Sequence, residues 1–300
     1  MCGRTACTLD KHGIQKASCP YSKTKEPPAW IQKYDWQNYQ PSYNLAPSQI
    51  SPVLVNSTTL SLKELDEVVL FPMRWGLIPS WYKGSLEGFT LKTNNCRQEG
   101  ILEKPTYRGP ATAGRRCVIL ADGFYEWKIC GSKQKQPYFI YFPQEEGPDV
   151  FTQKLDISDD VKYNGPRLLT MAGLFDTWKS SENEVIYSYS VVTMDASKTA
   201  SFVHSRMPAI LENEDEVSMW LDSQRVPVKK ALSILKPIEN LQMHPVSTLV
   251  NNSRNNSIDC IKPMSLEKKV SPMKTTGLTA WLKRGQTDLG NDAKHFKKEN

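Results

Sequence analysis

Residues 117–127, CVILADGFYEW, form a strongly apolar run that ends in a cluster of acidic and aromatic residues. Val, Ile, Phe, Tyr and Trp suit the pleated, half-buried surface of a β-strand, so we expect a strand here. Most runs of this kind in the chain are bounded by Gly, Pro or Asn, which favour turns. The same composition predicts further strands at residues 51–56, 68–79, 137–142, 168–178 and 185–194.

Helical patterns are fewer than strand patterns. Asn213 is a favourable N-cap, and three acidic residues and an apolar stripe at helical spacing follow it. A second helix is expected at residues 228–235, which lie between two prolines. The strands show no alternation with helices, as a parallel sheet would require. The sequence therefore predicts an α+β fold whose sheets are mostly antiparallel and close toward a barrel.

The chain divides by charge into a long domain and a short tail. Residues 1–260 contain no repeat and no Gly/Ser-rich linker, which indicates one domain. Residues 261–300 hold nine Lys or Arg and four Asp or Glu with few apolar residues, so we expect a basic, disordered tail. Such tails favour nucleic acid or nuclear import, although a solubilising role explains the composition equally well. Within it, residues 277–284 place Leu278, Trp281 and Leu282 on one helix face that suits a partner protein.

Composition also limits the compartment and the cofactors. No apolar run approaches the ~20 residues of a membrane span, and the N-terminus lacks a secretory pattern, so we expect a cytosolic or nuclear protein. The odd number of cysteines indicates free thiols. Zinc ligands can be imagined near the N-terminus, but no C-x2-C pair is present, so we expect neither metal nor cofactor. The cysteines are Cys2, Cys7, Cys19, Cys96, Cys117, Cys130 and Cys260, and the imagined zinc set is Cys2, Cys7, His12 and Cys19.

The first four residues, Met1-Cys2-Gly3-Arg4, offer an unusual nucleophile. Removal of Met1 leaves Cys2 with an α-amine and a thiol on adjacent carbons. These groups ordinarily titrate near ~8 and ~8.5, so neutral amine and thiolate both exist at neutral pH. Together they convert an aldehyde first into an imine and then into a five-membered thiazolidine. A small residue after the initiator methionine is nevertheless common, so this hypothesis needs support from the rest of the chain.

Two aromatic clusters interrupt the strand patterns. Residues 43–47, YNLAP, place Asn44 before a proline, and an Asx-turn is the simplest interpretation. Residues 74–82, RWGLIPSWY, set three aromatics beside a cation in what we expect to be an exposed loop. Aromatic faces with an interleaved Arg suit base stacking on single-stranded nucleic acid, and they suit a protein core equally well.

Two polar clusters and one histidine carry potential chemistry. Residues 93–97, TNNCR, offer amide donors beside a guanidinium, which is a pairing suited to a sugar oxygen and a phosphate. Asp122 precedes a glycine and is interpreted as a turn residue, whereas Glu126 should be partly buried and needs a cationic partner such as an N-terminal amine. His204 lies two residues from Arg206, and a lone histidine is more often structural unless acid–base work is implied.

Taken together, these motifs resemble one protein family, that of the SOS response-associated peptidases (SRAP). The resemblance covers residues 2 to about 260, and the insertions and basic tail are similar to those of its animal members. It implies antiparallel sheets wrapped into a barrel-like core with peripheral helices. It also implies that the protein shields abasic sites in single-stranded DNA through a DNA–protein crosslink. The motifs, in order, are Met1-Cys2-Gly3-Arg4, YNLAP at 43–47, RWGLIP at 74–79, NCR at 95–97, ADGFYEW at 121–127, HSRMPA at 204–209 and HPVS at 244–247.

The resemblance implies roles for individual residues. Cys2 corresponds to the crosslinking nucleophile, Asn95 to the amide that holds the opened sugar, Glu126 to the acid beside the amine, and His204 to the proton donor for ring opening. Further implications are a monomer in the nucleus at replication forks, a lyase-like crosslinking activity, and a fork protein as partner of the tail. The positions implied to contact DNA are Arg4, Asn44, Trp75, Arg97 and Arg206.

Two other classes of protein remain open. An N-terminal-nucleophile peptidase or amidohydrolase would also begin with Met-Cys-Gly, and it would explain self-removal of Met1. The chain lacks the Gly-rich oxyanion segments that we expect of this class. A non-covalent reader of modified DNA would need Trp75 and Arg97 but would be indifferent to Cys2. The variant Cys2→Ala separates such a reader from a crosslinking protein.

Overall fold

The apolar run of residues 117–127 forms two strands that belong to two different sheets. In the computed structural model, which describes residues 2–62, 68–131, 134–145, 151 and 163–265, β8 (Arg116–Ala121) and β9 (Gly123–Cys130) meet at Asp122. The backbone N–H of Asp122 donates to the carbonyl of Ala6 over 2.8 Å. A Cβ on Gly123 would lie 2.5 Å from the Phe139 ring. The glycine therefore permits the close approach at which the chain changes sheets.

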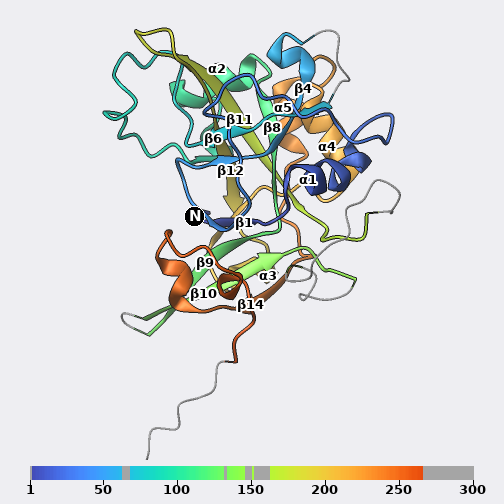
Figure 1. Ribbon diagram of the computed structural model, residues 1–300, viewed down its shortest axis with the longest axis vertical. Coiled ribbons are helices and arrows are strands. Elements are labelled where there is room, and N and C mark those ends of the chain that lie inside the picture. Colours follow the sequence, from blue (N-terminus) through green and yellow to red (C-terminus); the bar gives the residue numbers. More distant parts are fainter. Residues whose placement is uncertain (1, 63–67, 132–133, 146–150, 152–162, 266–300) are drawn as a thin grey trace, which may run out of the picture. The chain divides into compact units, whose positions relative to one another are not determined.

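The larger sheet has nine strands and is curved into a half-barrel (Figure 1). Its order is β3-β6-β12-β11-β8-β4-β5, and β7 and β13 also pair with β12. β6 and β7 run parallel to β12, whereas the other pairs are antiparallel. The bounds are β3 (Ile50–Ser51), β4 (Val53–Asn56), β5 (Val68–Leu70), β6 (Met73–Trp75), β7 (Asn95–Arg97), β11 (Leu169–Lys179), β12 (Val185–Asp195) and β13 (Arg206–Pro208).

The smaller sheet is antiparallel throughout, in the order β14-β10-β9-β1-β2. Residues 138–142 are all buried, so the strand predicted at residues 137–142 is covered on both faces. The Asx-turn expected at residues 43–47 is wrong, because Asn44 lies in β2 and its backbone joins the sheet. The bounds are β1 (Thr5–Cys7), β2 (Ser42–Leu45), β10 (Gln134–Tyr141) and β14 (Gln242–Pro245).

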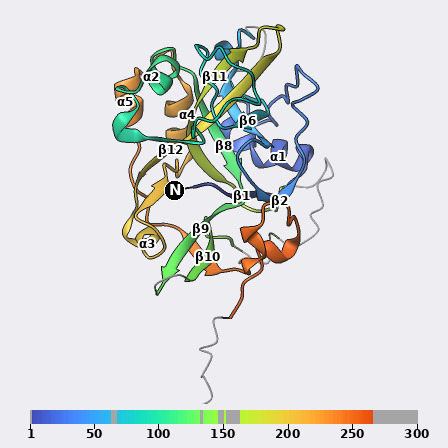
Figure 2. The same cartoon turned by 90° about the vertical axis from the view of Figure 1, so that its left-hand side faces the viewer.

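Short helices lie at the periphery of the sheets (Figures 1 and 2). As predicted, Asn213 caps α4, and its side-chain oxygen accepts the Glu216 N–H over 2.9 Å. Trp220 fixes α4 to β8, since its indole N–H donates to the Cys117 carbonyl over 2.9 Å. The helices are α1 (Lys11–Ala17), α2 (Pro105–Thr112), α3 (Lys198–Ser201), α4 (Glu214–Leu221) and α5 (Val228–Ser233), with 3-10 turns η1 (Cys19–Tyr21), η2 (Ser57–Leu60), η3 (Gln98–Gly100), η5 (Thr248–Asn251) and η6 (Ile258–Cys260).

These features confirm the predicted α+β fold with mostly antiparallel sheets. The expected single strand at residues 68–79 is wrong, because β5 and β6 are separate and the chain leaves the sheet after Trp75. Met1–Met264 form one compact unit. Residues 266–300 lie outside the described part of the chain, so the basic tail and its 277–284 segment stay predictions. Among the helices of the described residues, none has the length and apolar character needed to cross a membrane.

Candidate active site

Cys2 lies where the two sheets meet. The segment that leads into β1 runs beside β12 in both ribbon views (Figures 1 and 2), and Cys2 is fully buried. Its carbonyl oxygen accepts a hydrogen bond from Asn95 Nδ2 over 2.5 Å and a longer one from Asn94 Nδ2 over 3.5 Å. Because β1 belongs to the smaller sheet and β7 to the larger one, these amides tie the nucleophile to both.

The side-chain oxygen of Asn95 is in an unusual environment. Its Nδ2 binds the Cys2 carbonyl, while its Oδ1 is buried and has no hydrogen-bond partner among the described residues. Leaving a buried acceptor unpaired costs about 1–3 kcal/mol, and such atoms tend to mark functional positions. The amide therefore presents an acceptor beside Cys2 that suits an amine or a hydroxyl.

Glu126, in β9, is buried as the sequence predicted. Burial raises the pKa of the Cys2 thiol to about 12, and the negative charge of Glu126 is the second cause of this shift. The carboxylate therefore lies close enough to Cys2 to act on it electrostatically. Burial and the negative charge of Glu126 both favour the protonated thiol in this structure, so a thiolate at Cys2 stays a prediction.

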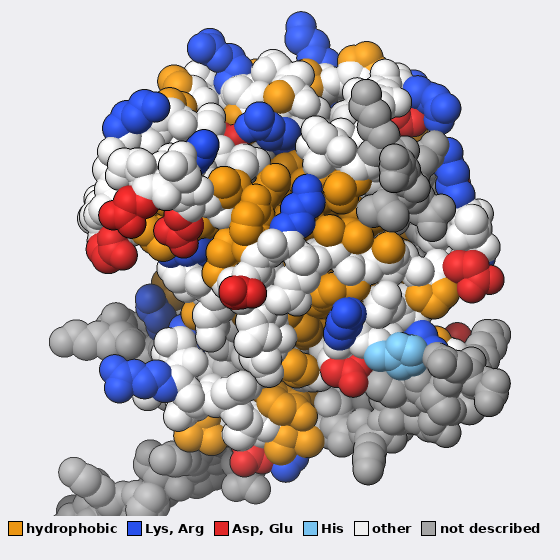
Figure 3. Space-filling model, turned by 45° about the horizontal axis from the view of Figure 1, so that its top comes forward, with side chains coloured by type: hydrophobic (Ala, Val, Ile, Leu, Met, Phe, Trp, Pro, Cys, Tyr) orange, Lys and Arg blue, Asp and Glu red, His pale blue; other side chains and the backbone are white. Residues whose placement is uncertain are grey.

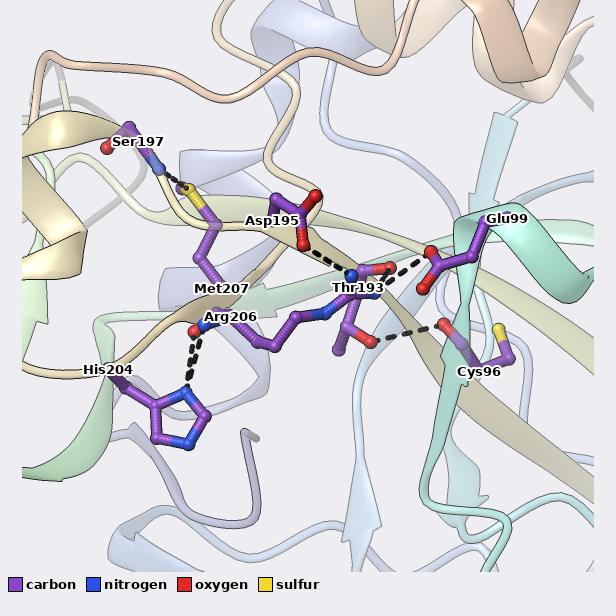
Figure 4. Close-up of polar contacts among 8 residues, drawn as sticks. All are labelled: Cys96, Glu99, Thr193, Asp195, Ser197, His204, Arg206 and Met207. Carbon is purple, nitrogen blue, oxygen red and sulfur yellow. Dashed lines mark hydrogen bonds and ion pairs between the residues drawn. The ribbon is translucent and has the colours of Figure 1, made fainter.

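Arg206 begins β13, and His204 lies two residues before it (Figure 4). The backbone N–H of Arg206 donates to His204 Nδ1 over 3.0 Å. A neutral ring that accepts at Nδ1 carries its hydrogen on Nε2, so Nε2–H is its donor. The imidazole and the Arg206 guanidinium leave the strand in different directions, which allows separate tasks for the two side chains.

β12 pairs with both β13, which follows His204, and β7, which contains Asn95. Thr193 pairs with Arg97 of β7 and with Pro208 of β13, so the two motifs flank the same strand. Arg97 is exposed, as a residue that contacts DNA must be. The sheet therefore gathers motifs that are more than 100 residues apart in sequence.

Arg206 is already engaged by carboxylates. Its guanidinium contacts Asp195 Oδ1 over 2.8 Å, Glu99 Oε2 over 3.0 Å and the Thr193 carbonyl over 2.9 Å, and its side chain is only 13% exposed. Figure 4 shows it stretched across β12 toward η3. A contact between Arg206 and DNA phosphate stays a prediction, and it would require the guanidinium to exchange these partners.

Arg4 and Asn44 hold the segment around η5. Arg4 donates to Asn44 Oδ1 and to the Val250 carbonyl, each over 2.7 Å. Asn44 is buried and donates to the carbonyls of Val250, Asn252 and Asn255 over 2.8–3.3 Å. Both side chains therefore stabilise this segment in the structure, and their predicted DNA contact remains untested.

Trp75 belongs to the core. The sequence predicted an exposed loop here, but Trp75 lies in β6 with 1% of its surface exposed, so that prediction is wrong. Its indole N–H donates to the Asn94 carbonyl over 2.9 Å, and its ring stacks on Tyr189. Trp81, from the same motif, is 50% exposed. Exposed hydrophobic and basic side chains are interspersed across the face shown in Figure 3.

Sequence reasoning missed two buried residues. Asp122 was interpreted as a turn residue, yet its carboxylate is buried, its Oδ2 accepts the Thr8 N–H over 2.8 Å, and burial raises its pKa to about 7. Tyr107, in α2, donates its hydroxyl to the Asn95 carbonyl over 3.1 Å. Neither had a sequence signal beyond its residue type. In the described part of the chain, no cluster of three or more His, Cys, Asp or Glu is arranged to hold a metal ion.

Comparison with known proteins defines the class. Residues 1–253 match the family described as SOS response associated peptidase (SRAP), so the chain belongs to that family. It is 48% identical over 278 residues to "Abasic site processing protein HMCES" of Xenopus tropicalis, covering 91% of this chain and 81% of that protein. It is 45% identical over 283 residues to the Rattus norvegicus protein of the same name, covering 91% and 78%.

More distant relatives include bacterial proteins. "Abasic site processing protein YoqW" of Bacillus subtilis is 33% identical over 226 residues, which cover 75% of this chain and 87% of that protein. A solved structure from Bordetella bronchiseptica superposes with a TM-score of 0.58 at 19% identity, covering 82% of this chain and 100% of that one. A Bacteroides thetaiotaomicron structure gives 0.57 at 24% identity, covering 75% and 86%. These two structures support the fold alone.

Proposed function

We propose that this protein processes abasic sites in single-stranded DNA by forming a thiazolidine crosslink through Cys2 after Met1 is removed. The observation that carries the proposal is the set of contacts around Cys2. Its carbonyl is held by Asn95, and the charge of Glu126 acts on its thiol. The names of the relatives, which describe abasic site processing, support the same substrate.

The reaction begins with the sugar. An abasic site exists mostly as a closed hemiacetal, and His204 donates a proton to the ring oxygen while it takes up the proton that the C1 hydroxyl loses, so the ring opens with no net proton change. The Cys2 amine then attacks the aldehyde carbon and forms a carbinolamine. Glu126 moves the protons of this addition and of the dehydration, so that one water leaves and an imine remains. Asn95 holds the sugar oxygens, and this proximity makes the two additions effectively intramolecular.

The raised pKa of the thiol suits this order of steps. A protonated sulfur leaves the amine as the first nucleophile. When the imine has formed, the Cys2 S–H adds across the C=N bond: sulfur bonds to carbon, and the proton ends on nitrogen after passing through Glu126. The product is a five-membered ring, and the overall reaction releases one water.

Single-stranded DNA is the expected substrate form, because the sugar must leave a duplex to reach a buried cysteine. The exposed Arg97 is positioned to neutralise a flanking phosphate. We place the protein in the nucleus at replication forks as a monomer, with residues 277–284 contacting a fork protein. Self-removal of Met1, as in a peptidase, is compatible with this reaction because it produces the same free amine.

Mass spectrometry tests the proposal directly. Purified protein is incubated with an oligonucleotide that carries one abasic site, and the products are denatured. We expect a conjugate whose mass equals the chain without Met1 plus the DNA minus one water. Cys2→Ala should give no stable conjugate while still binding DNA. Full conjugation by Cys2→Ala would contradict the proposal, and absence of a conjugate from the wild type would favour a non-covalent reader.

A further inference from the structure

Two buried aromatic donors hold the backbone of Asn94 and Asn95. The Asn94 carbonyl accepts the Trp75 indole N–H over 2.9 Å, and the adjacent Asn95 carbonyl accepts the Tyr107 hydroxyl over 3.1 Å. The donors come from β6 and α2, which are separate elements. The two side-chain amides of the same residues donate to the Cys2 carbonyl. Both backbone carbonyls and both side-chain Nδ2 groups of this dipeptide therefore have a hydrogen-bond partner.

Both donors are held firmly by the core. Trp75 is 1% exposed, and its ring lies parallel to that of Tyr189 with 6.3 Å between the centroids. The Tyr189 hydroxyl in turn contacts Ser51 Oγ. Tyr107 is also buried. β7 has only three residues and pairs on one side with β12, so its own ladder holds the backbone weakly. Two donors that cannot move therefore add to the contacts that fix this backbone.

We propose that Trp75 and Tyr107 are positioning residues that aim the amides of Asn94 and Asn95 at Cys2. This inference rests on the proposed function of the same site, and it gives Trp75 a task other than contact with DNA. Without Tyr107 the Asn95 carbonyl loses this donor, whereas without Trp75 the Asn94 carbonyl keeps the Val191 N–H, which it accepts over 3.0 Å. Either change removes one contact that holds the dipeptide, so its backbone is free to shift. A shift of about 1 Å at a reacting centre costs on the order of 10²-fold in rate.

The variants Tyr107→Phe and Trp75→Phe test the proposal. Each removes one donor and keeps an aromatic ring. The single-turnover rate of crosslinking is measured at saturating DNA, and affinity is measured with DNA that carries a tetrahydrofuran site, which has no aldehyde. We expect the rate to fall ~10- to 100-fold with an unchanged Kd. A weaker Kd with an unchanged saturated rate for Trp75→Phe would overturn the proposal and return Trp75 to DNA contact.

Matched controls remove the same groups elsewhere. The Tyr39 hydroxyl donates to the carbonyls of Cys7 and Leu9, both over 2.8 Å, and the Trp220 indole donates to the Cys117 carbonyl over 2.9 Å. Tyr39→Phe and Trp220→Phe should lower Tm comparably and leave the crosslinking rate unchanged. Equal rate losses in controls and test variants would show that the two donors act through stability alone.

A second readout does not depend on crosslinking. The side-chain amide of Asn95 should give a distinct NMR signal while it is bonded to the Cys2 carbonyl, and Tyr107→Phe should shift or broaden it. If the wild type forms no conjugate, the proposed function fails, and this signal still decides whether the donors fix Asn95. An unchanged signal in both variants would overturn the inference. Tyr107→Phe removes a single oxygen, so it keeps the test available if Trp75→Phe does not fold.

Discussion

The side-chain amide of Asn95 donates to the carbonyl oxygen of Cys2 over 2.5 Å and joins the start of the chain to the larger sheet. Asn95→Ala should therefore slow crosslinking by about 10²-fold, because Cys2 loses its alignment with the sugar. Asn94→Ala is the matched comparison, since its contact is 3.5 Å long. It should cost only a few-fold in the same quenched-flow assay. Equal effects from both variants would contradict the role given to Asn95.

The terminus allows a test of the ring itself. The amine and the thiol must belong to one residue to close a five-membered ring, so a residue retained before Cys2 should abolish the stable crosslink. The fold should persist, which circular dichroism can check. A tag at the other end of the chain is the control and should leave crosslinking intact. A fully active chain with an extra N-terminal residue would refute the thiazolidine.

Variants of Glu126 and His204 should differ in which form of the aldehyde they crosslink slowly. Glu126→Gln should slow the first covalent step with any aldehyde, whereas His204→Ala should slow reaction with the closed hemiacetal most. Losses of up to roughly 10²–10⁴-fold are typical of removed acid–base groups. An aldehyde that cannot cyclise, offered in the same single-stranded DNA, should restore His204→Ala and leave Glu126→Gln slow. Equal recovery of both variants would show that the two roles are wrongly divided.

The same division predicts the reverse reaction. Ring opening and imine formation run backwards through the same groups, so His204→Ala should also slow release of a preformed crosslink. Release is measured by trapping the free protein with excess unlabelled abasic DNA. Faster release from His204→Ala than from the wild type would argue against this proton donor.

Salt dependence should distinguish the two arginines. A phosphate contact to a single strand contributes about −0.7 to the slope of log affinity against log salt. Arg97→Gln should reduce the slope by about that amount, since Arg97 is exposed. Arg206→Gln should reduce it less, because Glu99 and Asp195 already neutralise its charge. A larger slope change from Arg206→Gln would mean that it releases both carboxylates on binding.

Asp122 should make stability depend on pH. Burial raises its pKa in the folded protein from 3.8 to about 7, so the folded state holds this proton more tightly than the unfolded state. Its contribution to the free energy of unfolding is therefore complete below about pH 4 and is lost as pH rises toward 7, by up to ~4 kcal/mol. Urea unfolding across this range should show the decline, and Asp122→Asn should flatten it. A variant that retains the full decline would assign it to another group.

Residue patterns predicted the long elements well. β11 and β12 lie within one residue of the predicted positions. Each has eleven residues, and β12 is rich in Val, Ile and Tyr while β11 contains Leu, Met, Phe and Trp, so both give a long strand signal. The burial of Glu126 followed from its aromatic neighbours. The family resemblance was confirmed by the match over residues 1–253.

Other features depend on contacts that composition does not encode. β1, β7 and β13 have three residues each, and β1 and β7 pair with β9 and β12, which lie far away in sequence. Helix α2 contains Gly109 and Pro110 in its interior, and both residues disfavour a helix that packing on β11 supports. The motif around Trp75 suited a surface and a core equally well, and the burial of Trp75 beside Tyr189 places it in the core.

The position of β1 has a consequence for how the protein is made. β1 is an inner strand, with β2 on one side and β9 (Gly123–Cys130) on the other. During synthesis it cannot complete its pairing until β9 has left the ribosome. At about 5–20 residues per second, that delay is on the order of ten seconds. The N-terminal residues therefore stay exposed while the chain grows, and Cys2 is buried only after β9 has been made.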